Sequence, residues 1–234
     1  MLKNLEKVKV WYYNFLEKVQ NMKRKIYEDF IQWKKNDARE CALMVDGARR
    51  IGKSYIIEEF AKNEYESYIL IDFNLVGDDV KSLFELYLND LDTFFMMLST
   101  IYGVKLIEGK SLIIFDEVQL FPKARAAIKY LVKDNRYDYI ETGSLISIKM
   151  NVKDIQIPSE ERHIKMHPMD FEEFCWALGD EITVPTIKEM FKKRGNFGPL
   201  YRKINTLFRQ YIIVGGMPKA VAIFAETRDF EKTD

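Results

Sequence analysis

The chain is poor in the residues that form covalent or metal cross-links. It contains two cysteines, Cys41 and Cys175, and two histidines, His163 and His167. Two cysteines this far apart exclude the dense disulfide framework of small secreted proteins and predict free thiols in a reducing compartment. The histidines lie four residues apart and Cys175 follows, but a zinc site would need a fourth ligand that the pattern does not supply.

The chain also lacks a long apolar run and an excess of charge of either sign. No stretch is apolar over enough residues to span a bilayer, and the N-terminus shows no signal peptide. Lysine and arginine together number 36, as do aspartate and glutamate, so the overall charge gives no argument for nucleic acid. Hydrophobic residues make up 47% of the chain, enough for one sizeable core and part of a second domain. We expect a cytoplasmic protein without a membrane partner.

One stretch carries most of the functional information, because it fits the phosphate-binding pattern G-x-x-x-x-G-K-[ST]. It reads Gly47-Ala48-Arg49-Arg50-Ile51-Gly52-Lys53-Ser54. A short apolar run at 41–46 predicts a buried strand before it, and the apolar residues over 53–62 predict a helix after it. We expect the two glycines to let backbone N–H groups turn inward around an anion at the start of that helix.

Two side chains of this loop suit a nucleotide bound with a metal ion. Lys53 can reach the β- and γ-phosphates, and Ser54 can offer its hydroxyl to Mg²⁺. We assign nucleotide binding to all eight loop residues and to Tyr55, the next residue of the predicted helix.

A second stretch places two carboxylates at the end of an apolar strand. Residues 112–115 are large and apolar, and Asp116 and Glu117 follow them directly. A continuous apolar run is typical of a central parallel strand, and ligands of such sheets bind beyond the carboxyl ends of the strands. We expect Asp116 to hold the Mg²⁺ shell, and Glu117 to orient the attacking water or accept its proton.

Three weaker candidates follow in the sequence. A strand predicted at 137–141 ends in small hydroxyl residues, so Thr142 and Ser144 could contact the γ-phosphate or the water; helix capping by either residue is the alternative. Arg162 lies in the last strand, predicted at 160–166. It is a candidate arginine finger that would act on the nucleotide of a neighbouring subunit, and a solvated surface charge is the alternative.

We expect three parts along the chain. Apolar residues recur three and four apart over residues 1–36, which predicts one long basic helix that packs on the core, dimerises as a coiled coil or binds nucleic acid. The core that contains the phosphate-binding loop is predicted at 37–178, with one helix over 80–101. A helical segment at 179–234 would begin a truncated C-terminal region, with an interruption near 195–199.

Taken together, these motifs resemble those of a family of prokaryotic AAA-type P-loop ATPases. Members carry, after the ATPase domain, a C-terminal domain of unknown function that looks restriction-endonuclease-like and is largely missing here. The matching stretches are residues 47–54, 116–119, 141–144, 168–174 and 214–218. The resemblance implies an α/β fold, a three-layer αβα sandwich with a five-stranded parallel sheet, and it carries Lys53, Ser54, Asp116 and Glu117 over to ATP binding, metal binding and catalysis.

The sequence therefore predicts an ATPase that uses ATP and Mg²⁺. A different class remains open: an ATP-gated binding module or switch with negligible turnover. Either could act as a homo-oligomer, or on nucleic acid through the basic N-terminal helix or the missing C-terminal domain. The preference for adenine follows from the resemblance, since the loop reads phosphates and not the base.

Overall fold

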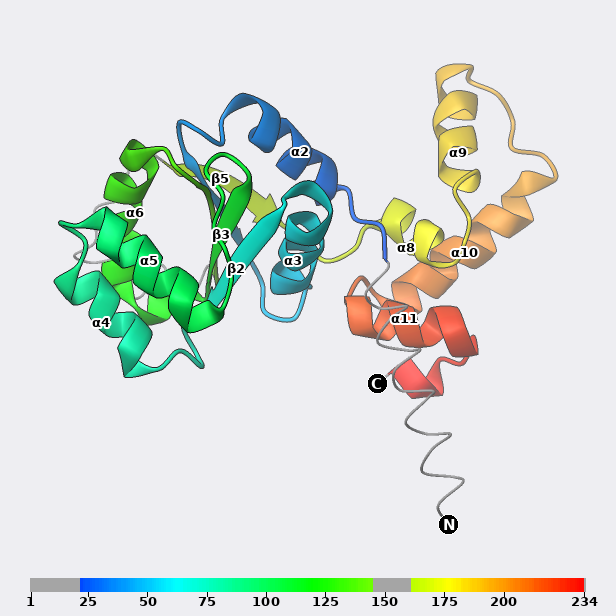
Figure 1. The fold of residues 1–234 in the computed structure, drawn as a ribbon. Coiled ribbons are helices and arrows are strands. Elements are labelled where there is room, and N and C mark those ends of the chain that lie inside the picture. The colour runs from blue at the N-terminus through cyan, green and yellow to red at the C-terminus, as the bar shows by residue number, and fades with distance from the viewer. Residues whose placement is uncertain (1–21, 145–160, 234) are drawn as a thin grey trace, which may run out of the picture. The chain divides into compact units, whose positions relative to one another are not determined.

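The computed structural model describes residues 22–144 and 161–233, which fall into two compact units (Figure 1). The first, here called the sheet unit, spans Ile26–Met166, and the second, the helical unit, combines the described residues 22–25 with residues 167–233. These divisions differ from the expected ones after residues 36 and 178. Within the described residues, no helix has both the length and the apolar character needed to cross a membrane.

A five-stranded sheet forms the centre of the sheet unit, and every strand pair in it is parallel. The strand order is β2-β3-β4-β1-β5. The bounds are β1 Ala42–Gly47, β2 Ser67–Asp72, β3 Ser111–Asp116, β4 Asp138–Ser144 and β5 Glu161–Met166. All six residues of β3 are buried, as its apolar sequence predicts for a strand covered on both faces.

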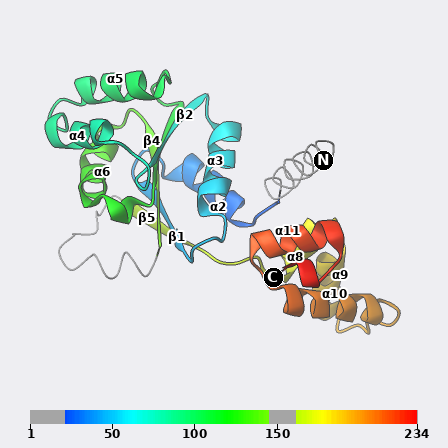
Figure 2. The ribbon, with the colours of Figure 1, turned by 90° about the horizontal axis from the view of Figure 1, so that it is seen from below.

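Helices cover both faces of this sheet and complete three layers (Figure 2). One cluster of buried side chains joins the sheet to α2 (Ile26–Asn36) and α3 (Lys53–Glu64). A second cluster joins the opposite face to α4 (Asp78–Leu86), α5 (Leu91–Tyr102) and α6 (Pro122–Asp134). Successive side chains of β3 point to opposite faces of the sheet. Leu112 and Ile114 therefore belong to the first cluster, and Ile113 and Phe115 belong to the second. The predicted αβα sandwich with a five-stranded parallel sheet is confirmed.

Two long helices expected from the sequence are interrupted. The helix predicted over 80–101 is divided into α4 and α5, because the Asp90 side chain caps α5 by accepting a hydrogen bond from the Thr93 backbone N–H at 3.2 Å. The helix predicted over 1–36 does not run through residues 22–25, and α2 begins at Ile26. Residues 1–21 lie outside the described part of the chain.

The described part of the helical unit contains four helices. They are α8 (Phe171–Ala177), α9 (Thr183–Lys192), α10 (Leu200–Val214) and α11 (Pro218–Thr227), followed by a short 3₁₀ turn, η3 (Glu231–Thr233). Three of the helices, α8, α10 and α11, contribute to a small apolar cluster. The cluster contains Met169, Phe174, Val214, Val221 and Phe224. The interruption predicted near 195–199 is confirmed as the connection between α9 and α10.

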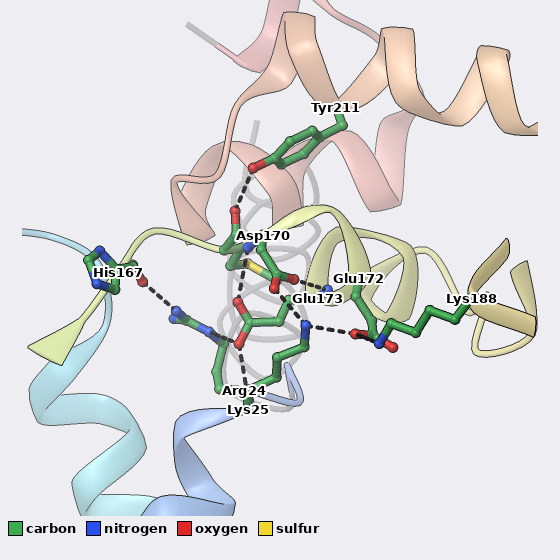
Figure 3. A network of polar contacts seen from close by, with 9 residues as sticks. Arg24, Lys25, His167, Asp170, Glu172, Glu173, Lys188 and Tyr211 are labelled. Atoms are coloured by element: carbon green, nitrogen blue, oxygen red, sulfur yellow. Dashed lines mark hydrogen bonds and ion pairs between the residues drawn. The ribbon is translucent and has the colours of Figure 1, made fainter. Parts of the chain in front are cut away.

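Glu173 explains why residues 22–25 are not helical (Figure 3). Its carboxylate accepts hydrogen bonds from Arg24 Nε at 3.1 Å and from the Lys25 backbone N–H at 2.8 Å. The same carboxylate caps α8 by accepting from the Asp170 N–H at 3.1 Å. Arg24 also donates to the carbonyl oxygen of His167 at 2.8 Å. Contacts from residues far away in the sequence thus replace the local bonds that a helix would need here.

We predict that Glu173→Ala destabilises the helical unit by about 3–5 kcal/mol, because it removes a buried carboxylate that pairs with the buried Arg24 guanidinium. Both side chains of this ion pair are only 6% exposed. The control is Lys188→Ala, which breaks an exposed ion pair with Glu172 and should cost at most about 1 kcal/mol. Urea unfolding followed by circular dichroism measures both, and equal losses would contradict the prediction.

A second buried polar group lies inside the sheet unit, on β4. Glu141 is fully buried, and neither of its carboxylate oxygens has a hydrogen-bond partner among the described residues. Burial raises the pKa of Glu141 well above 4.5, and the nearby Glu161 raises it further. Burial alone would also raise the pKa of Glu161, but hydrogen bonds from His163 and from Arg125, at 3.1 Å, lower it. Glu141 is therefore the neutral member of the pair and Glu161 the charged one.

We predict that Glu141→Gln makes folding stability less sensitive to pH. Above about pH 4.5 the unfolded chain loses the Glu141 proton while the folded chain keeps it, so wild-type stability falls by up to about 1.4 kcal/mol per pH unit. This loss continues until the raised folded-state pKa is reached, and an amide avoids it. Unfolding free energies of both proteins at several pH values between 5 and 8 test this; a difference that does not grow with pH would contradict it.

Candidate nucleotide-binding site

The phosphate-loop sequence lies between β1 and α3, as expected. Gly47 is the last residue of β1, and a Cβ atom at this position would lie 2.5 Å from the carbonyl oxygen of Met166. Gly52 has a φ of 88°, in the left-handed region, and directly precedes the first residue of α3. Ala48, Arg49 and Arg50 are exposed at the tip, and the Ile51 side chain is buried. The loop thus joins a buried strand to a helix N-terminus.

Lys53, the first residue of α3, is only 5% exposed. Its ammonium group donates hydrogen bonds to the carbonyl oxygens of Ala48 at 2.9 Å and of Gly47 at 3.3 Å. Burial lowers the pKa of Lys53, and the carboxylates of Glu117 and Asp116 offset part of that effect. A buried cation in the first turn of a helix is suited to an anionic ligand.

Asp116 is the centre of a hydrogen-bond cluster from three elements. Its Oδ1 accepts from Ser54 Oγ of α3 at 2.9 Å and from Thr142 Oγ1 of β4. Thr142 Oγ1 in turn accepts from the Glu117 backbone N–H at 3.0 Å. Burial raises the pKa of Asp116, and the two hydroxyl hydrogen bonds oppose that rise. The Thr142 hydroxyl therefore links the Asp116 side chain to the Glu117 backbone.

The oxygens of Ser54 and Asp116 fit a Mg²⁺ ion. Hydroxyl and carboxylate oxygens are its preferred ligands, and Mg²⁺ commonly uses one or two protein groups together with substrate phosphates and water. Within residues 22–144 and 161–233, no cluster of three or more histidine, cysteine, aspartate or glutamate side chains could hold a metal alone. These two residues would therefore hold Mg²⁺ only together with a nucleotide.

Glu117 follows β3 in an unusual backbone conformation. Its φ is 53°, in the left-handed region that residues other than glycine seldom adopt. The side chain is half-buried, and Oε2 accepts a hydrogen bond from the amide Nε2 of Gln119. Gln119 lies in the stretch 116–119 that carries the family resemblance, but no role was predicted for it, because a glutamine three residues beyond a strand carries no signal of its own.

The remaining predicted site residues are placed differently. Ser144, the last residue of β4, pairs in register with Gly47, which brings its backbone next to the loop. Tyr55 is half-buried in the first turn of α3. Arg162 pairs in register with Leu43 and forms an ion pair with Asp37.

Arg162 therefore lies far from the phosphate loop of its own chain. It is four residues before Met166, which pairs with Gly47, so about 13 Å of strand separates it from the loop. The structure does not bring Arg162 into the cluster of Lys53, Ser54 and Asp116. Its action on a neighbouring subunit stays a prediction.

Comparison with known proteins adds several similarities. The uncharacterized protein MJ1637 of Methanocaldococcus jannaschii is 25% identical over 199 residues, which cover 80% of this chain and 40% of that protein. This chain therefore spans less than half the length of that curated relative.

Two solved structures are similar to this chain at low identity. The Walker-type ATPase PABY2304 of Pyrococcus abyssi has 15% identity and a TM-score of 0.49, covering 91% of this chain and 70% of that one. The Aeropyrum pernix ORC1 protein in complex with DNA has 10% identity and a TM-score of 0.47, covering 90% and 63%.

A family model gives the assignment. The model of the AAA_14 family, described as an AAA domain, matches residues 39–175, more than half of the chain. The match includes the phosphate loop, the two carboxylates Asp116 and Glu117 at the end of β3, and the hydroxyl residues at the end of β4. This chain belongs to the AAA_14 family of AAA domains.

Proposed function

We propose that this protein is an ATPase that hydrolyses ATP with the help of Mg²⁺. The observation that carries the proposal is the single hydrogen-bonded cluster of Ser54, Asp116 and Thr142, with the buried cation of Lys53 nearby. Three elements that are distant in the sequence bring together a hydroxyl, a carboxylate and a cation at the carboxyl end of a parallel sheet. Membership of the AAA-domain family supports adenine as the base.

In this mechanism the loop residues bind phosphate and fix its orientation. Backbone N–H groups of residues 47–54 and the Lys53 ammonium hold the β- and γ-phosphates, while Ser54 and Asp116 hold Mg²⁺. When bound, Mg²⁺ supplies charge stabilisation on the phosphate oxygens. Glu117 accepts a hydrogen bond from the attacking water and takes its proton as the water attacks in line. Thr142 holds Asp116 and the Glu117 backbone in place.

Two further residues would act close to the transferred phosphoryl group. Ser144, beside Gly47 in the sheet register, is proposed with Thr142 as the residue that responds to the γ-phosphate. Arg162 is proposed as an arginine finger that contacts the nucleotide bound to a neighbouring subunit of a homo-oligomer. For that role it would have to leave its ion pair with Asp37, in which 45% of its side-chain surface is exposed.

The placement of Arg162 favours one alternative function. The candidate arginine finger, Arg162, is bound to Asp37 at the far end of β5 and does not lie beside the phosphate loop of its own chain. The protein would then bind ATP as a switch with negligible turnover until a partner, another subunit or a nucleic acid, is present. Tight ATP binding without measurable turnover at any protein concentration would favour this alternative.

We predict that Lys53→Ala abolishes ATP binding and turnover, lowering kcat/KM at least about 100-fold, because the cation that faces the phosphates is lost. Lys62→Ala is the matched control. It lies on the same helix, is exposed, and pairs with Glu58 at 3.0 Å, so turnover should stay at the wild-type value. Steady-state hydrolysis and calorimetric ATP binding measure both effects. Unchanged binding in Lys53→Ala would reject the assigned site.

We predict that Glu117→Gln keeps ATP binding and lowers kcat by about 100- to 1,000-fold, because an amide binds water but cannot take its proton. Chelation of Mg²⁺ with EDTA should abolish wild-type turnover as well. Single-turnover hydrolysis with labelled ATP separates the chemical step from product release. A variant that hydrolyses ATP at the wild-type rate would show that another group activates the water.

A further inference from the structure

Gln119 makes a direct contact with the group that we assign to water activation. It belongs to the 3₁₀ turn η1 (Val118–Leu120), which begins immediately after Glu117. Its amide Nε2 donates a hydrogen bond to Glu117 Oε2. Of the Glu117 carboxylate, only Oε2 is engaged by this amide, so Oε1 is left to accept from another donor.

The turn that carries Gln119 is firmly held. Val118 is fully buried in the apolar cluster between the sheet and α4 to α6. Two backbone hydrogen bonds close the turn. The Leu120 N–H donates to the Glu117 carbonyl oxygen at 3.0 Å, and the Phe121 N–H donates to the Val118 carbonyl oxygen at 3.1 Å. The amide therefore reaches Glu117 from a rigid element, as a positioning group should.

The same pair carries two features that disfavour folding. Gln119 is only 6% exposed, and its amide Oε1 is buried without a hydrogen-bond partner in the described part of the chain. Glu117 has a left-handed backbone conformation. A glutamine kept for stability would have both ends of its amide satisfied, so these costs favour a functional contact.

We propose that Gln119 is a positioning residue that fixes the Glu117 carboxylate, so that Oε1 points to the attacking water. This inference rests on the proposed ATPase function and deepens it. Without the amide, the half-buried carboxylate could rotate toward the Lys53 ammonium, with which it interacts electrostatically. A carboxylate drawn to Lys53 would leave the line of attack and weaken phosphate binding by that lysine.

The test replaces Gln119 by a side chain of similar length that cannot donate a hydrogen bond. Gln119→Met should lower kcat about 10- to 100-fold, with a KM for ATP within about twofold of wild type. Its melting temperature should equal or exceed that of wild type, because the buried unpartnered oxygen disappears. A purely structural role predicts the opposite change in melting temperature.

A double-mutant cycle shows whether Gln119 acts through Glu117. In the Glu117→Gln background, Gln119→Met should cause no further loss of kcat. Leu120→Ala is the matched control, since this residue is on the same turn and 49% exposed, and it should hydrolyse ATP like wild type.

Three results would overturn the inference while the proposed ATPase function stands. The first is a kcat of Gln119→Met equal to that of wild type, and the second is a kcat above it. The third is that Gln119→Met lowers kcat by the same factor in the wild-type and the Glu117→Gln backgrounds. Absence of turnover in the wild-type protein would instead reject the proposed hydrolysis, and this inference with it.

Discussion

The candidate site depends on one hydrogen-bond acceptor, the Oδ1 atom of Asp116. It receives the Ser54 hydroxyl from the helix that follows the phosphate loop and the Thr142 hydroxyl from the neighbouring strand. Asp116 is 7% exposed, so a carboxylate here is costly unless such donors accompany it. These donors place the loop helix and two strands around the same atom, which fixes the loop relative to the carboxylates of β3.

The local parts of this arrangement could be predicted from the sequence. Each motif is contained within eight or nine consecutive residues. One stretch holds the spaced glycines and the adjacent Lys53-Ser54 pair, and the other holds an apolar strand that ends in two acids. The elements that carry them are short and strongly patterned, so strand, loop and helix were placed within a few residues. The parallel sheet followed from the family resemblance, and the structure confirms it.

Contacts between distant residues could not be predicted in this way. Arg24 and Glu173 are separated by 149 positions, and no local pattern marks the two as partners. Heptad-like spacing therefore suggested one helix through residues 22–25, where the backbone instead binds Glu173. Glu141 resembled any polar residue at a strand end, and only the packed sheet shows that it is fully buried. No sequence pattern marks Gln119 either, since its contact with Glu117 depends on the conformation of a turn.

The two glycines of the phosphate loop differ in what makes them necessary. At Gly47 the obstacle is volume, because a methyl group would meet the Met166 carbonyl oxygen at 2.5 Å. At Gly52 the obstacle is handedness, because a φ of 88° disfavours an L-amino acid and is readily adopted by its mirror image. A D-alanine introduced at position 52 by chemical synthesis would match that backbone. For Gly47, by contrast, the required property is the absence of a side chain in the space next to β5. Glycine is thus required at one position of the motif for steric reasons and at the other for stereochemical reasons, and the sequence pattern alone does not distinguish the two.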